Sequence, residues 1–286
     1  MTATGNQESP GFSRGEDVKS VLRGTGEAAE RRHAIHHLEQ VMGTVVTIDV
    51  YTDAGTSGGE IHRNLARARA ILQSADTVFS TWKVDSPISR LRRGEITCEQ
   101  APPEVAEVLR QCETAREMSC GWFDPWAMPG GVDPTGYVKG WAAQRALSAL
   151  ASTEIRGAIV NAAGDIASIG GPEFAKPFRI GIVDPSSPGH LACVVELPGA
   201  IATSGTYERG HHLIDPHSGQ PTARVASASV SGADLGLADA LATAVAVAGE
   251  EALALVEGLD GYEALTIAFD GTWRWTANFP FASTSS

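Results

Sequence analysis

The pattern of apolar and polar residues predicts four helices. Apolar residues recur at intervals of three and four over residues 60–79 and 104–118, which is typical of helices with one buried face. Pro102 and Pro103 precede the second helix, and Gly121 supplies a stop after it. A third helix is predicted over residues 138–150. The fourth, over residues 235–248, is apolar on nearly every side, so we expect it to be buried.

Short β-branched and apolar runs predict strands between the helices and after them. These runs cover residues 42–50, 158–160, 179–183, 193–197 and 225–230, with Pro and Gly clusters between the later ones. Gly43 is expected to mark a close backbone approach. Asp270-Gly271, between the runs 265–269 and 272–275, predicts a hairpin. Helices followed by runs of adjacent strands favour an α+β fold with mixed, largely antiparallel sheets over a doubly wound parallel sheet.

The first 36 residues differ from the rest of the chain. They lack hydrophobic periodicity and are rich in Gly, Glu and Arg, so we predict a flexible leader over residues 1–36 and a single domain, of one or two lobes, over residues 37–286. The leader has no apolar stretch of the kind an export signal requires, and no later run reaches membrane-spanning length. A cytoplasmic protein without a membrane anchor is therefore expected.

Charge and cysteine content narrow the classes of partner. The formal net charge of -12 over 286 residues, without a local basic stripe, argues against binding to nucleic acid. One bound divalent cation would still allow a single phosphorylated ligand to bind. The four cysteines form no C-x-x-C pair, so reduced thiols are expected and a structural zinc site is not.

The apolar helix over residues 235–248 contains a candidate metal site. Asp239 and Thr243 stand four residues apart, so both side chains lie on one helical face. A buried carboxylate needs a compensating partner, and a carboxylate with a hydroxyl suits Mg²⁺, which keeps waters and phosphate oxygens in its other positions. The alternative is that Asp239 is exposed or caps a loop while Thr243 bonds to its own helix.

A second candidate site lies where a Pro- and Gly-rich loop enters the third helix. Asp133, Gly136 and Lys139 follow one another at intervals of three at this junction. Free backbone N–H groups, the helix dipole and one ammonium group suit a phosphate or a carbonyl-rich ring edge. The alternative is an ordinary helix start with Asp133 as its N-cap.

Three further segments carry weaker signals. Residues 202–207 can form an anion-binding turn, and His212 precedes an Asp-Pro turn, where a near-neutral histidine can take a proton from an attacking hydroxyl. The alternative places His211 and His212 in solvent at a strand end. Residues 161–165 form a Gly-containing turn to which we assign no role.

Together and in this order, the segments resemble the ApbE family of FAD:protein FMN transferases, from Met42 to the C-terminal hairpin. The resemblance implies an α+β, T-fold-like architecture, FAD as substrate and Mg²⁺ as cofactor. It rests on the Met-Gly-Thr start at residue 42 and on residues 79–91, 121–124, 133–140, 164–165, 202–205, 212–219 and 238–243.

The resemblance also implies roles for single residues. Magnesium would be held by Asp239, Thr243 and the backbone oxygen of Gly136, and His212 matches the histidine implicated in catalysis. The residues implied in FAD binding are Met42, Trp82, Trp122, Phe123, Asp124, Asp133, Lys139 and Ile214.

The chain departs from the family pattern at several points. The linker between Asp124 and Asp133 is shorter than in many relatives, Trp82 stands where Tyr is common, and the usual Gly-Gly-Asp is Ala163-Gly-Asp. A tryptophan can still stack on a flavin or adenine ring. Many relatives are exported lipoproteins. Because no export signal is seen here, the acceptor is expected to be cytosolic or on the cytoplasmic side of a membrane protein.

The implied reaction cleaves the FAD pyrophosphate and joins FMN by a phosphoester bond to a Thr or Ser hydroxyl of an acceptor flavoprotein, with release of AMP. Two alternatives stay open at this point. An FAD pyrophosphatase would use water in place of the acceptor hydroxyl, and a non-catalytic FAD-binding protein would hold the dinucleotide without cleaving it.

Overall fold

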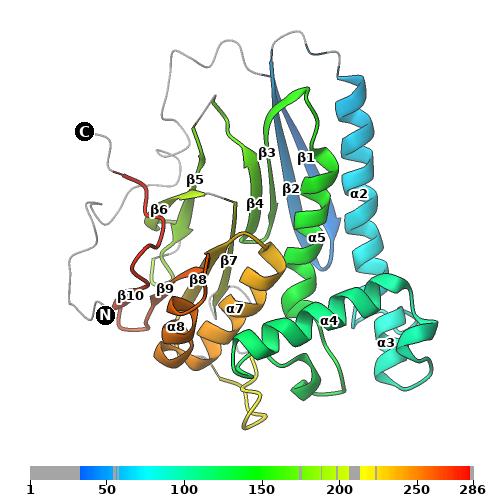
Figure 1. Cartoon of the computed structure of the whole chain (residues 1–286), viewed down its shortest axis with the longest axis vertical. Helices are drawn as coiled ribbons and strands as arrows, with labels where there is room; N and C mark the ends of the chain where they lie inside the picture. Colours follow the sequence, from blue (N-terminus) through cyan, green and yellow to red (C-terminus); the bar gives the residue numbers. More distant parts are fainter. Residues whose placement is uncertain are drawn as a thin grey trace.

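The computed structural model describes residues 33–53, 56, 58–173, 176–187, 189–197, 199–205, 213–222 and 224–283. Within these residues an antiparallel sheet has the strand order β1-β2-β3-β4-β7-β8-β9-β10, and β5 pairs with β6 in a second sheet (Figure 1). The strands are β1 (His33–Val41), β2 (Thr44–Thr52), β3 (Ile155–Ala162), β4 (Asp165–Gly170), β5 (Phe178–Val183), β6 (Leu191–Leu197), β7 (Ala200–Gly205), β8 (Ser227–Gly232), β9 (Glu263–Ile267) and β10 (Trp273–Trp275).

Helices cover one face of the large sheet. Helix α5 packs on β3 and β4, α7 packs on β7 and β8, and α2 lies beside α5 (Figure 1). The helices are α2 (Gly59–Phe79), α3 (Pro87–Arg92), α4 (Pro103–Met118), α5 (Thr135–Leu150), α7 (Leu235–Ala248) and α8 (Glu250–Glu257), with short 3₁₀ turns η2 (Cys98–Gln100) and η3 (Pro125–Ala127). The site described below is built on this helical layer.

The main core lies between the helices and the sheet. On β2, Val46, Ile48 and Val50 alternate with more exposed residues, so one face of the strand is fully buried. Helix α2 contributes a stripe that includes Ala68 and Leu72, while α7 is buried along nearly its whole length. Burial of α7 on all sides fixes the position of its few polar residues.

A smaller core lies on the opposite face of the large sheet. Ile166 and Ile201 point into it and pack with Phe178 and Ile182 of the β5–β6 sheet. The ring of Tyr51 contacts that of Phe178 at a centroid distance of 5.5 Å. The sheet is thus covered on both faces in its middle, which holds the strand ends at the site in place.

The predicted α+β class is confirmed, since every described strand pair is antiparallel and helices pack on the sheet. The four predicted helices are present with bounds shifted by no more than three residues. The prediction of a strand starting at Met42 is wrong, because Met42 and Gly43, at φ 55° and 69°, form the turn between β1 and β2. Apart from its chain neighbours, no heavy atom of the described residues lies within 4 Å of the position a Gly43 Cβ would take, so these residues do not make the expected close approach.

Strand β1 begins at His33, inside the region predicted as a leader. The hydrophobic pattern did not predict this strand because many of its residues are polar. It pairs with β2 along its whole length, and Glu39 accepts hydrogen bonds from Arg69 and Gln73 of α2. Residues 1–32 lie outside the described residues. Within the part of the chain that the structure covers, no helix is long and apolar enough to cross a membrane.

Two further differences concern a predicted turn and two short helices. The turn predicted at residues 202–207 is in its first part strand β7, which pairs with β8 through residue 205, and residues 206–207 lie outside the described residues. Helices α3 and α8 were not predicted, since six and eight residues are too few to display a helical period.

Candidate functional site

A cleft of about 700 Å³ opens between the helical layer, the loop that precedes α5 and the segment 213–216 that precedes β8. Its walls come from the β1–β2 turn, the end of α2, the loop before α5, the start of α5, the end of β7 and the middle of α7. Eleven of the twelve residues singled out from the sequence line it: Met42, Trp82, Trp122, Phe123, Asp124, Asp133, Gly136, Lys139, Ile214, Asp239 and Thr243. The twelfth, His212, lies outside the described residues.

Asp239 is a buried carboxylate on the cleft wall. It is 3% exposed, and the backbone N–H of Gly140, on α5, donates to its Oδ2 over 3.2 Å. Burial raises the pKa of Asp239 well above its usual value, the charge of Asp165 raises it further, and Lys139 and the Gly140 hydrogen bond oppose the shift. The alternative in which Asp239 is an exposed helix residue is therefore wrong.

Thr243 stands one helical turn after Asp239 and faces the same cleft. Its hydroxyl lies 3.3 Å from the hydroxyl of Ser204, at the end of β7. A Cβ on Gly136 would lie 3.5 Å from the Thr243 hydroxyl and 3.2 Å from the Phe123 ring. A side chain at residue 136 would therefore be tight against the Phe123 ring and in ordinary contact with Thr243.

Lys139 forms an ion pair with Asp165, the first residue of β4. Asp165 is fully buried, and the Lys139 side chain is 18% exposed. Both Lys139 and Asp239 line the cleft. Two carboxylates and one ammonium group therefore meet at the junction of α5, β4 and α7.

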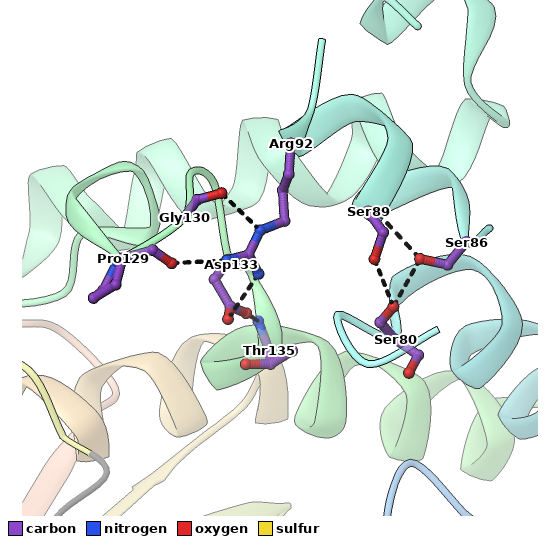
Figure 2. A network of polar contacts seen from close by, with 8 residues as sticks. All are labelled: Ser80, Ser86, Ser89, Arg92, Pro129, Gly130, Asp133 and Thr135. Carbon is purple, nitrogen blue, oxygen red and sulfur yellow. Dashed lines mark hydrogen bonds and ion pairs between the residues drawn. The ribbon is translucent and has the colours of Figure 1, made fainter. Parts of the chain in front are cut away.

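The start of α5 is braced by Arg92, the last residue of α3 (Figure 2). Its guanidinium donates to the carbonyls of Pro129 and Gly130, over 2.8 and 3.2 Å, and to Asp133 Oδ2 over 3.2 Å. The other oxygen of Asp133 accepts from the Thr135 backbone N–H. The alternative in which Asp133 is the N-cap is wrong, because the N-cap of α5 is Pro134 and Asp133 lies one position before it.

The other end of α3 holds the loop that carries Trp82. The hydroxyls of Ser86 and Ser89 both donate to the Ser80 carbonyl, over 2.7 and 3.2 Å (Figure 2). Trp82 itself is 94% exposed at the cleft edge. An indole so placed offers a flat apolar surface to a ring system that enters the cleft.

Trp122 forms part of the facing wall and is held from two sides. The His217 ring meets it edge-on at a centroid distance of 4.4 Å, and the Arg224 guanidinium lies 5.2 Å from its ring centre. Asp124 accepts from Arg116 Nε over 2.8 Å and from the Trp126 backbone N–H. The loop before α5 is thus fixed by contacts at both of its ends.

Several residues of the site escaped prediction. Asp165 lies in the turn segment to which the sequence assigned no role, and only the packing of α5 on β4 reveals its contact with Lys139. Asp76 lines the cleft and accepts from the Met42 backbone N–H over 3.0 Å and from Lys83 over 2.5 Å. Met42 and Asp76 are 34 residues apart, and no spacing rule links them.

The described residues provide hard oxygen donors of the kind that Mg²⁺ prefers. Asp239 supplies a buried carboxylate, Thr243 a hydroxyl, and the backbone of Gly136 lies close to that hydroxyl. Within the described residues no group of three or more His, Cys, Asp or Glu side chains could hold a metal ion, so hydroxyl or backbone oxygens would have to complete a site here. The donor set therefore fits a magnesium ion that keeps most of its positions for water or ligand oxygens.

Comparison with known proteins identifies the family. The ApbE family profile matches residues 42–130 and 127–266, which include all the cleft residues named above. The chain belongs to the ApbE family.

Two curated ApbE relatives, both called FAD:protein FMN transferase, are similar in sequence. The one from Rhodobacter capsulatus is 37% identical over 151 residues, which is 49% of this chain and 29% of the relative. The one from Vibrio cholerae serotype O1 is 36% identical over 131 residues, which is 42% of this chain and 39% of the relative. The chain thus matches less than half the length of either protein.

Solved ApbE structures share the fold. The flavin transferase ApbE from Vibrio cholerae superimposes with a TM-score of 0.74 at 22% identity, covering 87% of this chain and 98% of that structure. The ApbE protein from Thermotoga maritima gives a TM-score of 0.73 at 21% identity, covering 86% and 97%. At these identities the likeness establishes the α+β architecture alone.

Proposed function

We propose that this ApbE-family chain is a Mg²⁺-dependent FAD:protein FMN transferase. The observation that carries the proposal is that Asp239, Thr243 and Gly136 line one cleft with Lys139, although they come from two helices far apart in sequence. The names of its two curated relatives support the same reaction. The substrates would be FAD and an acceptor flavoprotein with a Thr or Ser target.

In the proposed reaction the acceptor hydroxyl oxygen attacks the FMN phosphorus. A new P–O bond forms to the acceptor, the P–O bond to the AMP phosphate breaks, and AMP leaves with the bonding electron pair. The hydroxyl proton passes to a base, which the family resemblance assigns to His212. Phosphoryl transfer depends mainly on alignment and charge stabilisation, so little covalent chemistry is asked of the protein.

Each part of the cleft has a proposed task. Asp239, Thr243 and the Gly136 carbonyl would hold Mg²⁺, which when bound neutralises charge on the pyrophosphate. The Lys139 ammonium would lie beside the phosphates. The FAD rings would rest against apolar and polar side chains of the walls, namely Met42, Trp82, Trp122, Phe123, Asp124, Asp133 and Ile214.

Release of AMP from FAD tests whether the cleft is catalytic. Purified protein is incubated with FAD, an acceptor protein and Mg²⁺, and AMP is quantified by chromatography. We expect AMP only with Mg²⁺, and a loss of about a hundredfold or more in Asp239→Asn, because the metal contributes several kcal/mol to such steps. Asp260→Asn, which alters an exposed carboxylate after α8, is the control. Equal AMP release by Asp239→Asn and the control would refute the metal assignment.

A further inference from the structure

Asp165 lies behind the cleft wall that Lys139 and Asp239 form. It starts β4, directly after the turn at Ala163 and Gly164, and its side chain is fully buried. The ion pair with Lys139 compensates its charge, and the Asp239 carboxyl group lies beside it.

A buried ion pair such as Asp165–Lys139 is not expected to add much to the stability of the fold. Burying a carboxylate costs several kcal/mol, and a buried ion pair can often be replaced by apolar side chains without loss. The surrounding helices are packed with alanine, valine and leucine, so an apolar pair would suit this position. We therefore look for a role of the Asp165 and Lys139 charges in the cleft.

Lys139 stands near two carboxylates, and its ammonium can neutralise either of them. The charges of both Lys139 and Asp165 act on Asp239, the former stabilising its ionised form and the latter opposing it. An ammonium that settled on Asp239 would compete with a divalent cation for the same oxygens. An ammonium held by Asp165 leaves those oxygens available.

We propose that Asp165 is a positioning residue, which retains the Lys139 ammonium and thereby keeps Asp239 available to a divalent cation. This inference rests on the proposed function in one respect, the assignment of Asp239 as a cation ligand. It adds a role for a residue that does not line the cleft. It also explains why a tightly packed interior keeps an ion pair behind the ligand wall.

This role can be tested by measuring cation binding to single and double variants, with no need to measure catalysis. Mn²⁺ serves as the probe, and its binding to the protein without FAD is followed by water-proton relaxation. In Asp165→Asn we expect affinity to fall about tenfold or more, the usual effect of losing an outer-shell partner. Removing the competing ammonium as well, in the double variant Asp165→Asn with Lys139→Met, should restore affinity to that of Lys139→Met alone. A merely structural role for Asp165 predicts no such rescue.

Two controls separate the possible failures. Glu39→Gln removes another buried carboxylate of the same sheet, one that contacts α2 away from the cleft, and should leave Mn²⁺ affinity unchanged. Asp239→Asn should abolish the site. If Asp239→Asn binds Mn²⁺ like the unaltered protein, the metal assignment fails and this inference fails with it. If Asp239→Asn loses the ion but Asp165→Asn does not, or the double variant stays weak, the role of Asp165 alone is overturned.

Discussion

The backbone N–H of Gly140 on α5 donates to the Asp239 carboxylate on α7, 99 residues further along the chain, over 3.2 Å. This contact depends on how closely the two helices cross. A Cβ on Gly140 would lie 2.4 Å from the Leu235 carbonyl oxygen, so only glycine permits the crossing. The helix that carries Lys139 and the helix that carries Asp239 are thereby set against each other.

Gly140→Ala should separate these helices. Because the obstructing atom is backbone, we expect a loss of about 1–3 kcal/mol in the free energy of unfolding, measured by urea denaturation. Gly59→Ala, at the start of α2, is the control, since the nearest atom to its Cβ would be a side-chain nitrogen at 3.8 Å. Equal stability of the two variants would mean that the crossing tolerates a side chain.

The turn before Asp165 stores strain that glycine would relieve. Ala163 adopts φ 51°, which costs an L-residue about 1–2 kcal/mol, whereas glycine takes this conformation freely. Since glycine also gains entropy in the unfolded chain, we expect Ala163→Gly to stabilise the protein by about 0.5 kcal/mol. Gly164→Ala, at φ 92°, should destabilise it by about 1–3 kcal/mol. Thermal denaturation of both variants checks the two signs, and a destabilised Ala163→Gly would contradict the strain.

Glu39 makes the attachment of β1 to α2 dependent on pH. Hydrogen bonds from His37, Gln73 and Arg69 lower its pKa from 4.5 to about 2. A carboxyl with a lowered pKa in the folded state contributes stability that is complete above its unfolded pKa and is lost as pH falls. The stability difference between the protein and Glu39→Gln should therefore be constant near neutral pH and shrink between pH 4.5 and about 2.

Denaturant titrations at several pH values measure this difference. At neutral pH we expect Glu39→Gln to cost about 1–3 kcal/mol, because three part-buried hydrogen bonds lose their charged acceptor. Glu95→Gln is the control, since Glu95 forms an exposed ion pair with Arg93 and its loss should leave the stability nearly unchanged. A difference that persists unchanged below pH 3 would show that Glu39 does not titrate as expected.

Arg92 is expected to hold the loop before α5 in place. Arg92→Met removes three hydrogen bonds from the loop that ends at Asp133 (Figure 2). If FAD binds in this cleft, we expect its dissociation constant to rise about tenfold, a cost of about 1.4 kcal/mol, with a smaller effect on turnover. Quenching of flavin fluorescence measures the affinity. Arg110→Met, on the exposed side of α4, is the control, and equal affinity of the two variants would exclude this role.

The sequence predicted those parts of the fold whose patterns are local. The period of α2 and α4 is visible in their apolar residues, and the apolar α7 made its single carboxylate conspicuous. Strand β1 was missed because its anchoring depends on Glu39 reaching α2. Strand β7 was missed because its Thr203 and Ser204 resemble a turn, although pairing with β8 determines its form.

The same limit applies to the candidate site. The four-residue spacing of Asp239 and Thr243 follows from helical geometry and was available from the sequence. The contacts of Asp165 with Lys139 and of Arg92 with Asp133 join separate elements, so no spacing rule predicts them. The resemblance to the ApbE family implied which residues line the cleft, but not which contacts hold them in place.

Covalent attachment of FMN to a second protein is the most direct test of the proposed activity. An extract of the source organism is incubated with the purified chain, FAD and Mg²⁺, and proteins are separated under denaturing conditions, scanned for flavin fluorescence and weighed by mass spectrometry. We predict that a protein gains the mass of FMN less water, and that this gain disappears without Mg²⁺ or with Asp239→Asn. Conversion of FAD to AMP and free FMN without any labelled protein would contradict the transferase and identify a pyrophosphatase instead.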